Sequence, residues 1–465
     1  HSDRSLARTL PHASREPFTE RECKAPALPK SESYSCRRPL RVLLQVEHFE
    51  QGGLEQVMLD LAATLSAAQM TVGLLVLGRQ GTAAFEARRA GLPILHLPQL
   101  GRAQAYRDLL RDWDLVNAHH SLFGVELVAE AGRPFVQTVH SAYVGLDADM
   151  RAAYRRADAA TTAYVYVSKA AAYYAQASLG LSPQRMLIIP NGIDLEKLDA
   201  ARAATDRAAQ RLALGLAEQD FVFLNVASIY PPKAQGLLVA ALHRARQHNP
   251  HLKLALLGPI MDEAYAERVR EQAERLGVAD AILWLGHRPD PQQLYMLCDA
   301  FVLPSFVEGW SLSLAEALYA RLPIAATDVG AAAELVDPQR GRLVPPPYAS
   351  ILDIDGAESF ARLLAKEQPQ FVENLSAAML AVSECAPPPP IPPDLARRLD
   401  RRHAYQGYVR LFESLAAGEH AVVRSCVSNL HEADPSQCAA LDTQPAAGPG
   451  ARKESQNQCS EMIAK

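Results

Sequence analysis

Residues 300–316 read AFVLPSFVEGWSLSLAE, and the rest of the chain is interpreted outward from this stretch. The apolar run Ala300–Leu303 predicts a buried strand, and the apolar spacing that follows predicts a helix over Leu312–Ala320. Ser311 or Ser313 can cap this helix and leave bare N–H groups at its positive dipole end. Proteins hold phosphate groups in this way, at a helix start that follows a strand.

Two glutamates flank the turn. Glu308 lies in the loop and Glu316 lies early in the helix, where a carboxylate is electrostatically favoured. Carboxylates in a cleft can accept hydrogen bonds from the hydroxyls of a sugar or a ribose. The alternative is a pair of solvated side chains beside an ordinary helix start, but the preceding strand, Gly309 and Pro304–Ser305 favour a ligand site.

Strands and helices alternate along the whole chain, which predicts an α/β fold with parallel sheets covered on both faces. In the second half we expect helices at Gln235–Gln247, Glu263–Leu276 and Pro291–Leu297, and strands at Phe221–Val226, Leu252–Leu257, Ile282–Leu285, Ala300–Leu303 and Pro323–Ala326. In the first half we expect helices from Leu54 and at Gly81–Ala90, and strands at Arg41–Val46, Thr71–Leu77, Ile94–Leu97, Leu115–Asn117, Phe135–Thr138, Tyr164–Val167 and Leu187–Ile189. Ligands of such sheets bind beyond the carboxyl ends of the strands.

The length of 465 residues exceeds one comfortable core and predicts two Rossmann-like, doubly wound domains. We place them at residues 39–190 and 191–392. Disordered tails are expected at 1–38 and 420–465, because both are polar and lack periodicity. After the proline cluster Pro387–Pro393, Leu395–Leu415 reads as one long helix or a bent pair, and residues 393–419 are expected to cross back to the first domain.

Composition excludes several classes of protein. The net charge is −5 with no long basic run, so nucleic acid is not an expected partner. Seven scattered cysteines without a C-x-x-C pair support neither zinc nor a disulfide framework, and a reducing cytoplasm fits them. No apolar stretch approaches the roughly 20 residues of a membrane span. The chain opens at His1 rather than methionine, which we interpret as a fragment or an expression boundary.

The stretch from Pro304 to Glu316 resembles the signature of the retaining GT-B glycosyltransferases of family 4, in which P-S-x-x-E-G is followed by a second glutamate. The resemblance spans about residues 40–340, and the last helix matches in kind. It implies two domains facing across a cleft, with Glu308 on the donor hexose and Glu316 on the ribose. The backbone at the turn would hold the diphosphate, which implicates Gly309, Trp310, Ser311, Leu312 and Ser313. The family commonly has glycine where this chain has Ser311.

Lys233 follows the strand Phe221–Val226 and matches the family's diphosphate-binding lysine, although a surface lysine is the alternative. The family's arginine position is occupied by Ser228, so one expected cation is missing. In the first domain, Gly52 and Gly53 resemble the family's G-G-x-E turn, in which the backbone can approach a ligand closely.

Histidines at strand ends supply further candidates. His140 resembles the family's histidine at the reacting sugar, where it can hydrogen-bond the donor and its phosphate. His119 and His120 occupy a comparable strand end and rank lower. His287 and Arg288 lie in the loop that contacts the nucleotide base in similar enzymes. Two D-x-D triplets, at 147–149 and 353–355, lack the expected preceding strand, so no metal site is predicted.

The sequence therefore predicts a hexosyltransferase that uses a UDP- or GDP-sugar and needs no other cofactor, and the resemblance implies retention of configuration. Its catalytic residues would be His140, Glu308 and Lys233. The acceptor is expected to be a glycan or a lipid-linked molecule, reached from the cytoplasm or the inner face of a membrane. Two alternatives follow from the same pattern. A degenerate domain that binds a nucleotide or a protein without turnover would be consistent with Ser228, whereas an epimerase would require a Tyr-x-x-x-Lys pair that the region from Tyr164 to Ser168 lacks.

Overall fold

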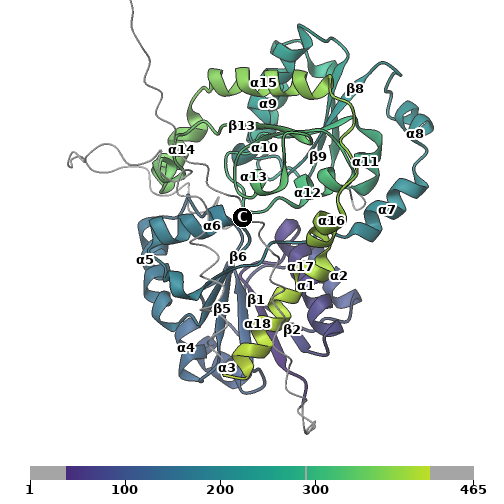
Figure 1. Cartoon of the computed structure of the whole chain (residues 1–465). Coiled ribbons are helices and arrows are strands. Elements are labelled where there is room, and N and C mark those ends of the chain that lie inside the picture. Colours follow the sequence, from purple (N-terminus) through teal and green to yellow (C-terminus); the bar gives the residue numbers. More distant parts are fainter. Residues whose placement is uncertain (1–37, 289–290, 419–465) are drawn as a thin grey trace, which may run out of the picture. The chain divides into compact units, whose positions relative to one another are not determined.

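The computed structural model describes residues 38–288 and 291–418. It contains two parallel sheets, so the predicted α/β architecture is confirmed (Figure 1). Apart from Arg38, the tails predicted at 1–38 and 420–465 lie outside the described residues. No helix in the described ranges is both long enough and apolar enough to cross a membrane.

The first sheet has seven strands in the order β3-β2-β1-β4-β5-β6-β7. Their bounds are β1 Arg41–Val46, β2 Thr71–Val76, β3 Ile94–Leu95, β4 Leu115–His119, β5 Phe135–Val139, β6 Ala163–Tyr166 and β7 Met186–Ile188. The order reverses between β1 and β4, so the loops after these strands open the crevice in which such sheets bind ligands.

Alternating side chains of the strands bury both faces of this sheet. Leu43 of β1 packs with the core beneath α3 (Arg102–Leu110) and α4 (Val125–Glu130). Val42 and Leu44 point to the other face, which α1 (Gly53–Ala67) and α2 (Thr82–Arg89) cover. The remaining helices that follow strands in this half are α5 (Ala148–Ala157) and α6 (Lys169–Tyr174). The sheet is therefore doubly wound, as predicted.

The second sheet has six strands in the order β10-β9-β8-β11-β12-β13. The strands are β8 Phe221–Val226, β9 Leu252–Leu257, β10 Ile282–Gly286, β11 Ala300–Leu303, β12 Ile324–Thr327 and β13 Gly341–Val344. The helices of this half are α7 Leu195–Ala204, α8 Arg207–Ala213, α9 Gln235–Arg246, α10 Glu263–Arg275, α11 Gln292–Leu297, α12 Leu312–Tyr319, α13 Ala332–Leu335, α14 Ala357–Ala365 and α15 Pro369–Ser383. The order reverses between β8 and β11, so the loops carrying Lys233 and Glu308 flank the second crevice.

The C-terminal segment is divided more finely than the predicted long helix or bent pair. It forms α16 (Pro393–Leu399), α17 (Arg401–Ala404) and α18 (Gln406–Ala416). The break falls at Asp400, which pairs with Ile193 in an isolated bridge and caps α17 through its side chain. Of the two predicted forms, the single long helix over Leu395–Leu415 was wrong, because the pairing of Asp400 with Ile193 interrupts it.

The same segment packs on the first sheet, which confirms the predicted crossing. α17 and α18 lie along α1 (Figure 1). Tyr405, Tyr408 and Phe412 are buried in the core that β1 and β2 share with α1. The side chain of Tyr408 also lies 3.4 Å, hydroxyl to hydroxyl, from Thr138 of β5.

Candidate functional site

Ser311 is the cap of α12. Its hydroxyl accepts a hydrogen bond from the amide of Leu314 at 3.3 Å, so the prediction that a serine caps this helix holds for Ser311. The amides of Ser311, Leu312 and Ser313 have no hydrogen-bond acceptor in the described part of the chain. These three donors and the helix dipole are therefore available for an anion.

Glu308 and Lys233 are paired beside this helix start. The Lys233 ammonium donates to Glu308 Oε1 at 2.6 Å, and only 18% and 13% of the two side chains are exposed. Burial acts to lower the pKa of Lys233, but the charges of Glu308 and Tyr230 and the hydrogen bond to Glu308 outweigh it, and the pKa is raised. Lys233 therefore keeps its positive charge at the carboxyl ends of β8 and β11.

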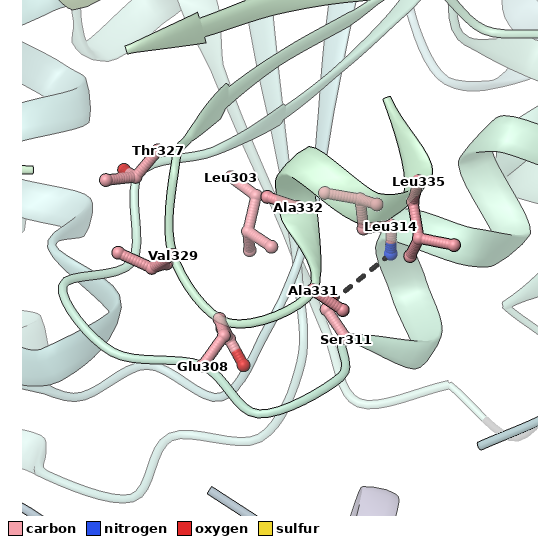
Figure 2. Close-up of a pocket in the computed structure, with 9 residues that line it drawn as sticks. All are labelled: Leu303, Glu308, Ser311, Leu314, Thr327, Val329, Ala331, Ala332 and Leu335. Atoms are coloured by element: carbon pink, nitrogen blue, oxygen red, sulfur yellow. Dashed lines mark hydrogen bonds between the residues drawn. The ribbon is translucent and has the colours of Figure 1, made fainter. Parts of the chain in front are cut away.

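A pocket with about 230 Å³ of empty space lies between the α12 cap and the loop that follows β12 (Figure 2). Glu308, Ser311 and Thr327 are its polar residues, and apolar side chains complete it. The carboxylate of Glu308 and the hydroxyl of Ser311, the cap of α12, therefore face the same small pocket.

Glu316 lies on α12 but does not line this pocket. Tyr295 donates to its carboxylate at 2.7 Å, and Gln292 lies 3.4 Å away. Burial raises the pKa of Glu316, although these hydrogen bonds oppose the shift. The predicted ribose contact thus sits on the side of α12 that faces α11, with its two oxygens already hydrogen-bonded.

Trp310 and Gly309 shape the turn itself. The Trp310 side chain is 7% exposed and belongs to the core of the second sheet, so only its backbone is available to a ligand. Gly309 packs directly on the backbone of His140, and a Cβ atom there would overlap the His140 carbonyl oxygen. Gly330, at φ +60, packs against the carbonyl oxygens of Glu308 and Gly309. The turn is therefore enclosed by backbone on two sides.

The first-domain glycines lie close to the same helix start. Gly52 precedes the first turn of α1, and a Cβ on Gly53 would lie 3.5 Å from the Leu312 side chain. Gln51 is hydrogen-bonded to the exposed His287 at 2.5 Å. The structure therefore brings the predicted loops of the two sheets together at one place.

Three histidines gather at the ends of β4 and β5. His119 Nδ1 lies 2.8 Å from His140 Nε2, and the His120 ring lies 5.7 Å from the His140 ring. Burial, with a contribution from the charge of His120, lowers the pKa of His119 to about 3. Burial, followed by the charges of His119 and His120, holds the pKa of His140 well below its ordinary value. His119, which the sequence ranked lower, is the direct partner of His140.

The remaining predicted donor-binding residues are Ser228 and Arg288. Ser228 is half-buried, and its carbonyl accepts from Gln235 at 2.9 Å, so it supplies no charge. Arg288 is half-buried just after β10, and no hydrogen bond or ion pair joins it to another described residue.

The two D-x-D triplets have structural roles. Asp147 caps α5, and Asp353 completes the capping box of Ser350. Asp355 accepts hydrogen bonds from Arg151, Tyr174 and Ser178. Among the described residues, no group of three or more His, Cys, Asp or Glu side chains is arranged to hold a metal ion.

Comparison with known proteins finds two matching families and several similar proteins. Residues 206–372 match the family described as Glycosyl transferases group 1, and residues 51–197 match Glycosyltransferase Family 4. D-inositol 3-phosphate glycosyltransferases are among the similar curated proteins. The protein from Segniliparus rotundus is 31% identical over 151 residues, 32% of this chain and 33% of that one. The protein from Geodermatophilus obscurus is 35% identical over 159 residues, 32% of this chain and 34% of that one. The chain thus matches about a third of the length of these relatives.

Solved structures share the fold over most of the chain. Anabaena Alr3699/HepE in complex with UDP-glucose has a TM-score of 0.60 at 21% identity and covers 81% of this chain and 100% of its own. A glycosyltransferase from Rickettsia africae has a TM-score of 0.61 at 15% identity, covering 81% of this chain and 98% of its own. The two family matches lie on either side of the boundary between the sheets. Together with the shared architecture, they identify the chain as a member of the family 4-like glycosyltransferases of the GT-B fold.

Proposed function

We propose that the chain transfers a hexose from a nucleotide sugar to a glycan or lipid-linked acceptor, with retention of configuration. The observation that carries this proposal is the capped start of α12, where three amides without an acceptor among the described residues lie beside Lys233 and Glu308. An anion-binding helix start next to a cation and a carboxylate suits a diphosphate joined to a sugar.

The diphosphate would take the place of Glu308 as the partner of Lys233. Glu308 would then be free to accept hydrogen bonds from hexose hydroxyls. Glu316, which already accepts from Tyr295 and Gln292, would accept from the ribose with the lone pairs that these bonds leave open. In the reaction, the bond from the anomeric carbon to the diphosphate breaks while the acceptor oxygen bonds to that carbon on the same face. The acceptor proton leaves with the departing phosphate oxygen. The amides and Lys233 stabilise the negative charge that develops on the leaving group.

This charge arrangement needs no metal ion, and we expect turnover to persist in the presence of EDTA. Uridine is the first base to test, because the similar Anabaena structure is a complex with UDP-glucose. Inositol 3-phosphate belongs in the acceptor panel, because the similar curated proteins are named for it. We expect the protein to work in the cytoplasm, at the inner face of a membrane where the acceptor is lipid-linked.

Thermal stabilisation by UDP-, GDP- and CMP-sugars tests donor binding, because a ligand that binds the folded state raises the melting temperature in proportion to the logarithm of its concentration over Kd. Lys233→Met is the matched variant, since it removes the charge and keeps the length of the side chain. We expect one nucleotide series to stabilise the wild type and to lose most of its effect in Lys233→Met. Equal shifts in both proteins, or none with any donor, would contradict the proposal.

A nucleotide-binding module without turnover is the second candidate. It is favoured by one observation, which is that Ser228 stands where the family has a cation. Stabilisation by a donor without release of the nucleotide diphosphate in any acceptor mixture would support it.

A further inference from the structure

The ring of His140 ends a chain of side-chain hydrogen bonds that begins in the middle of β4. Asn117 Oδ1 lies 2.9 Å from His119 Nε2, and His119 Nδ1 lies 2.8 Å from His140 Nε2. Asn117 and His119 are both 0% exposed. Their positions follow from the strand pairing, in which Asn117 lies opposite Val136 and His119 opposite Thr138.

The backbone determines the direction of this chain. Asn117 Nδ2 lies 3.1 Å from the carbonyl oxygen of Val136, which can only accept a hydrogen bond. The amide nitrogen must therefore face Val136, and the amide oxygen must face His119. Because the amide oxygen can only accept, His119 Nε2 has to carry a proton.

The proton positions then follow from ring to ring. A buried imidazole stays neutral, because desolvation disfavours its charged form. With its proton on Nε2, neutral His119 presents a bare Nδ1 to its neighbour. His140 Nε2 must in turn carry a proton in order to donate to it. A neutral His140 is then left with an unprotonated Nδ1, which has no partner among the described residues.

His140 also lies next to the turn that carries the proposed donor site. Its carbonyl oxygen packs against Gly309, in the turn next to Glu308. Its amide donates to the Tyr143 hydroxyl at 3.2 Å, which fixes the backbone that carries the ring. Building on the proposed function, we propose that Asn117 and His119 are positioning residues that hold His140 as the Nε2–H tautomer and leave Nδ1 to accept a hydrogen bond from a sugar hydroxyl.

This assignment narrows the role that the sequence predicted for His140. A bare Nδ1 can accept from a hydroxyl but cannot donate to a phosphate oxygen. The ring therefore recognises the hexose or the acceptor alcohol, and the diphosphate is left to Lys233 and the α12 amides.

The imidazole nitrogen signals of the full chain labelled with ¹⁵N-histidine test the tautomer without any need for turnover. His140 is assigned by its loss in His140→Gln. We expect a protonated Nε2 and an unprotonated Nδ1 at neutral pH. A protonated Nδ1 on His140 would overturn the inference.

Two substitutions at His119 separate positioning from folding. His119→Asn keeps an acceptor oxygen near the place of Nδ1, whereas His119→Leu removes it. We expect His119→Leu to show both tautomers of His140 and to lose about tenfold in kcat/KM, the effect of one hydrogen bond of ordinary strength. His119→Asn should recover a single tautomer and most of the rate. If both variants have native circular dichroism but show the same tautomers of His140 and the same kcat/KM, the inference is overturned.

Donor and acceptor analogues that lack one hydroxyl each identify the group that Nδ1 contacts. With one of these analogues, we expect His140→Gln to turn over as fast as the wild type, because the hydroxyl that Nδ1 contacts is already absent. Additive losses for every analogue would contradict a hydroxyl contact. A wild-type protein with the expected tautomer but no turnover would overturn the proposed function and leave the ring assignment in place.

Discussion

The close packing of Gly309 on His140 makes Gly309→Ala a sharp test of the site. A Cβ atom at this position would overlap the carbonyl oxygen of His140 and lie 3.0 Å from Ser141 Cα. Non-bonded heavy atoms settle at about 3.5 Å, so the two backbone segments have to separate by about 1–2 Å. No side-chain rotation relieves this overlap, because the atoms it meets belong to the backbone.

A displacement of this size matters more for turnover than for folding. Misplacing reacting groups by about 1 Å can cost roughly 10²-fold in rate. We therefore expect Gly309→Ala to reduce kcat by about two orders of magnitude while the nucleoside diphosphate still binds the helix amides and Lys233. The assay is steady-state transfer alongside calorimetric titration with UDP.

Gly236→Ala is the matched control. A Cβ there would lie 3.2 Å from the end of the Gln272 side chain, which can move, and α9 gains a better helix former. We expect near-normal turnover in this variant. A Gly309→Ala protein that turns over as fast as Gly236→Ala would refute the claim that the contact between Gly309 and His140 positions the reacting groups.

Three further predictions concern stability. Lys233→Met leaves Glu308 without its partner and should lower the free energy of unfolding by about 2–4 kcal/mol, whereas adding Glu308→Gln should restore part of it, as measured by a double-mutant cycle in urea; strict additivity would contradict a coupled pair. Asp355→Asn should cost about 2–3 kcal/mol in the same assay, because Arg151 is only 18% exposed and its hydrogen-bonded partner is lost; an unchanged midpoint would show that the pair contributes nothing. The pKa of His119 is about 3 in the folded chain and 6.5 when unperturbed, so its contribution to the free energy of unfolding is complete above pH 6.5 and falls by about 2 kcal/mol at pH 5. His119→Leu should therefore make the free energy of unfolding less dependent on pH between 6.5 and 5. An unchanged pH dependence would contradict a neutral buried ring.

Local patterns were sufficient to predict the elements around the site. The strand Ala300–Leu303 and the helix from Leu312 follow from the apolar spacing and the serine cap, and the structure has both at these positions. The short strand Gly341–Val344 and the helix Pro369–Ser383 were not predicted. The strand has an exposed Arg342 in its centre, and the helix has no capping side chain.

The contacts within the site required the three-dimensional arrangement. Lys233 and Glu308 meet because β8 and β11 are neighbours in the sheet, and strand order is not written in the local sequence. The pairing of His119 with His140 depends in the same way on the register of β4 and β5. The helix break at Asp400 depends on its pairing with Ile193, some 200 residues earlier in the chain.

The release of nucleoside diphosphate from a nucleotide sugar, followed with the wild type and Glu308→Ala in parallel, tests the central claim most directly. We expect the wild type to release it in step with formation of a glycosylated acceptor, and Glu308→Ala to bind the free nucleotide but release at least tenfold less. Equal rates in the two proteins would contradict the assignment of the donor sugar to the turn before α12.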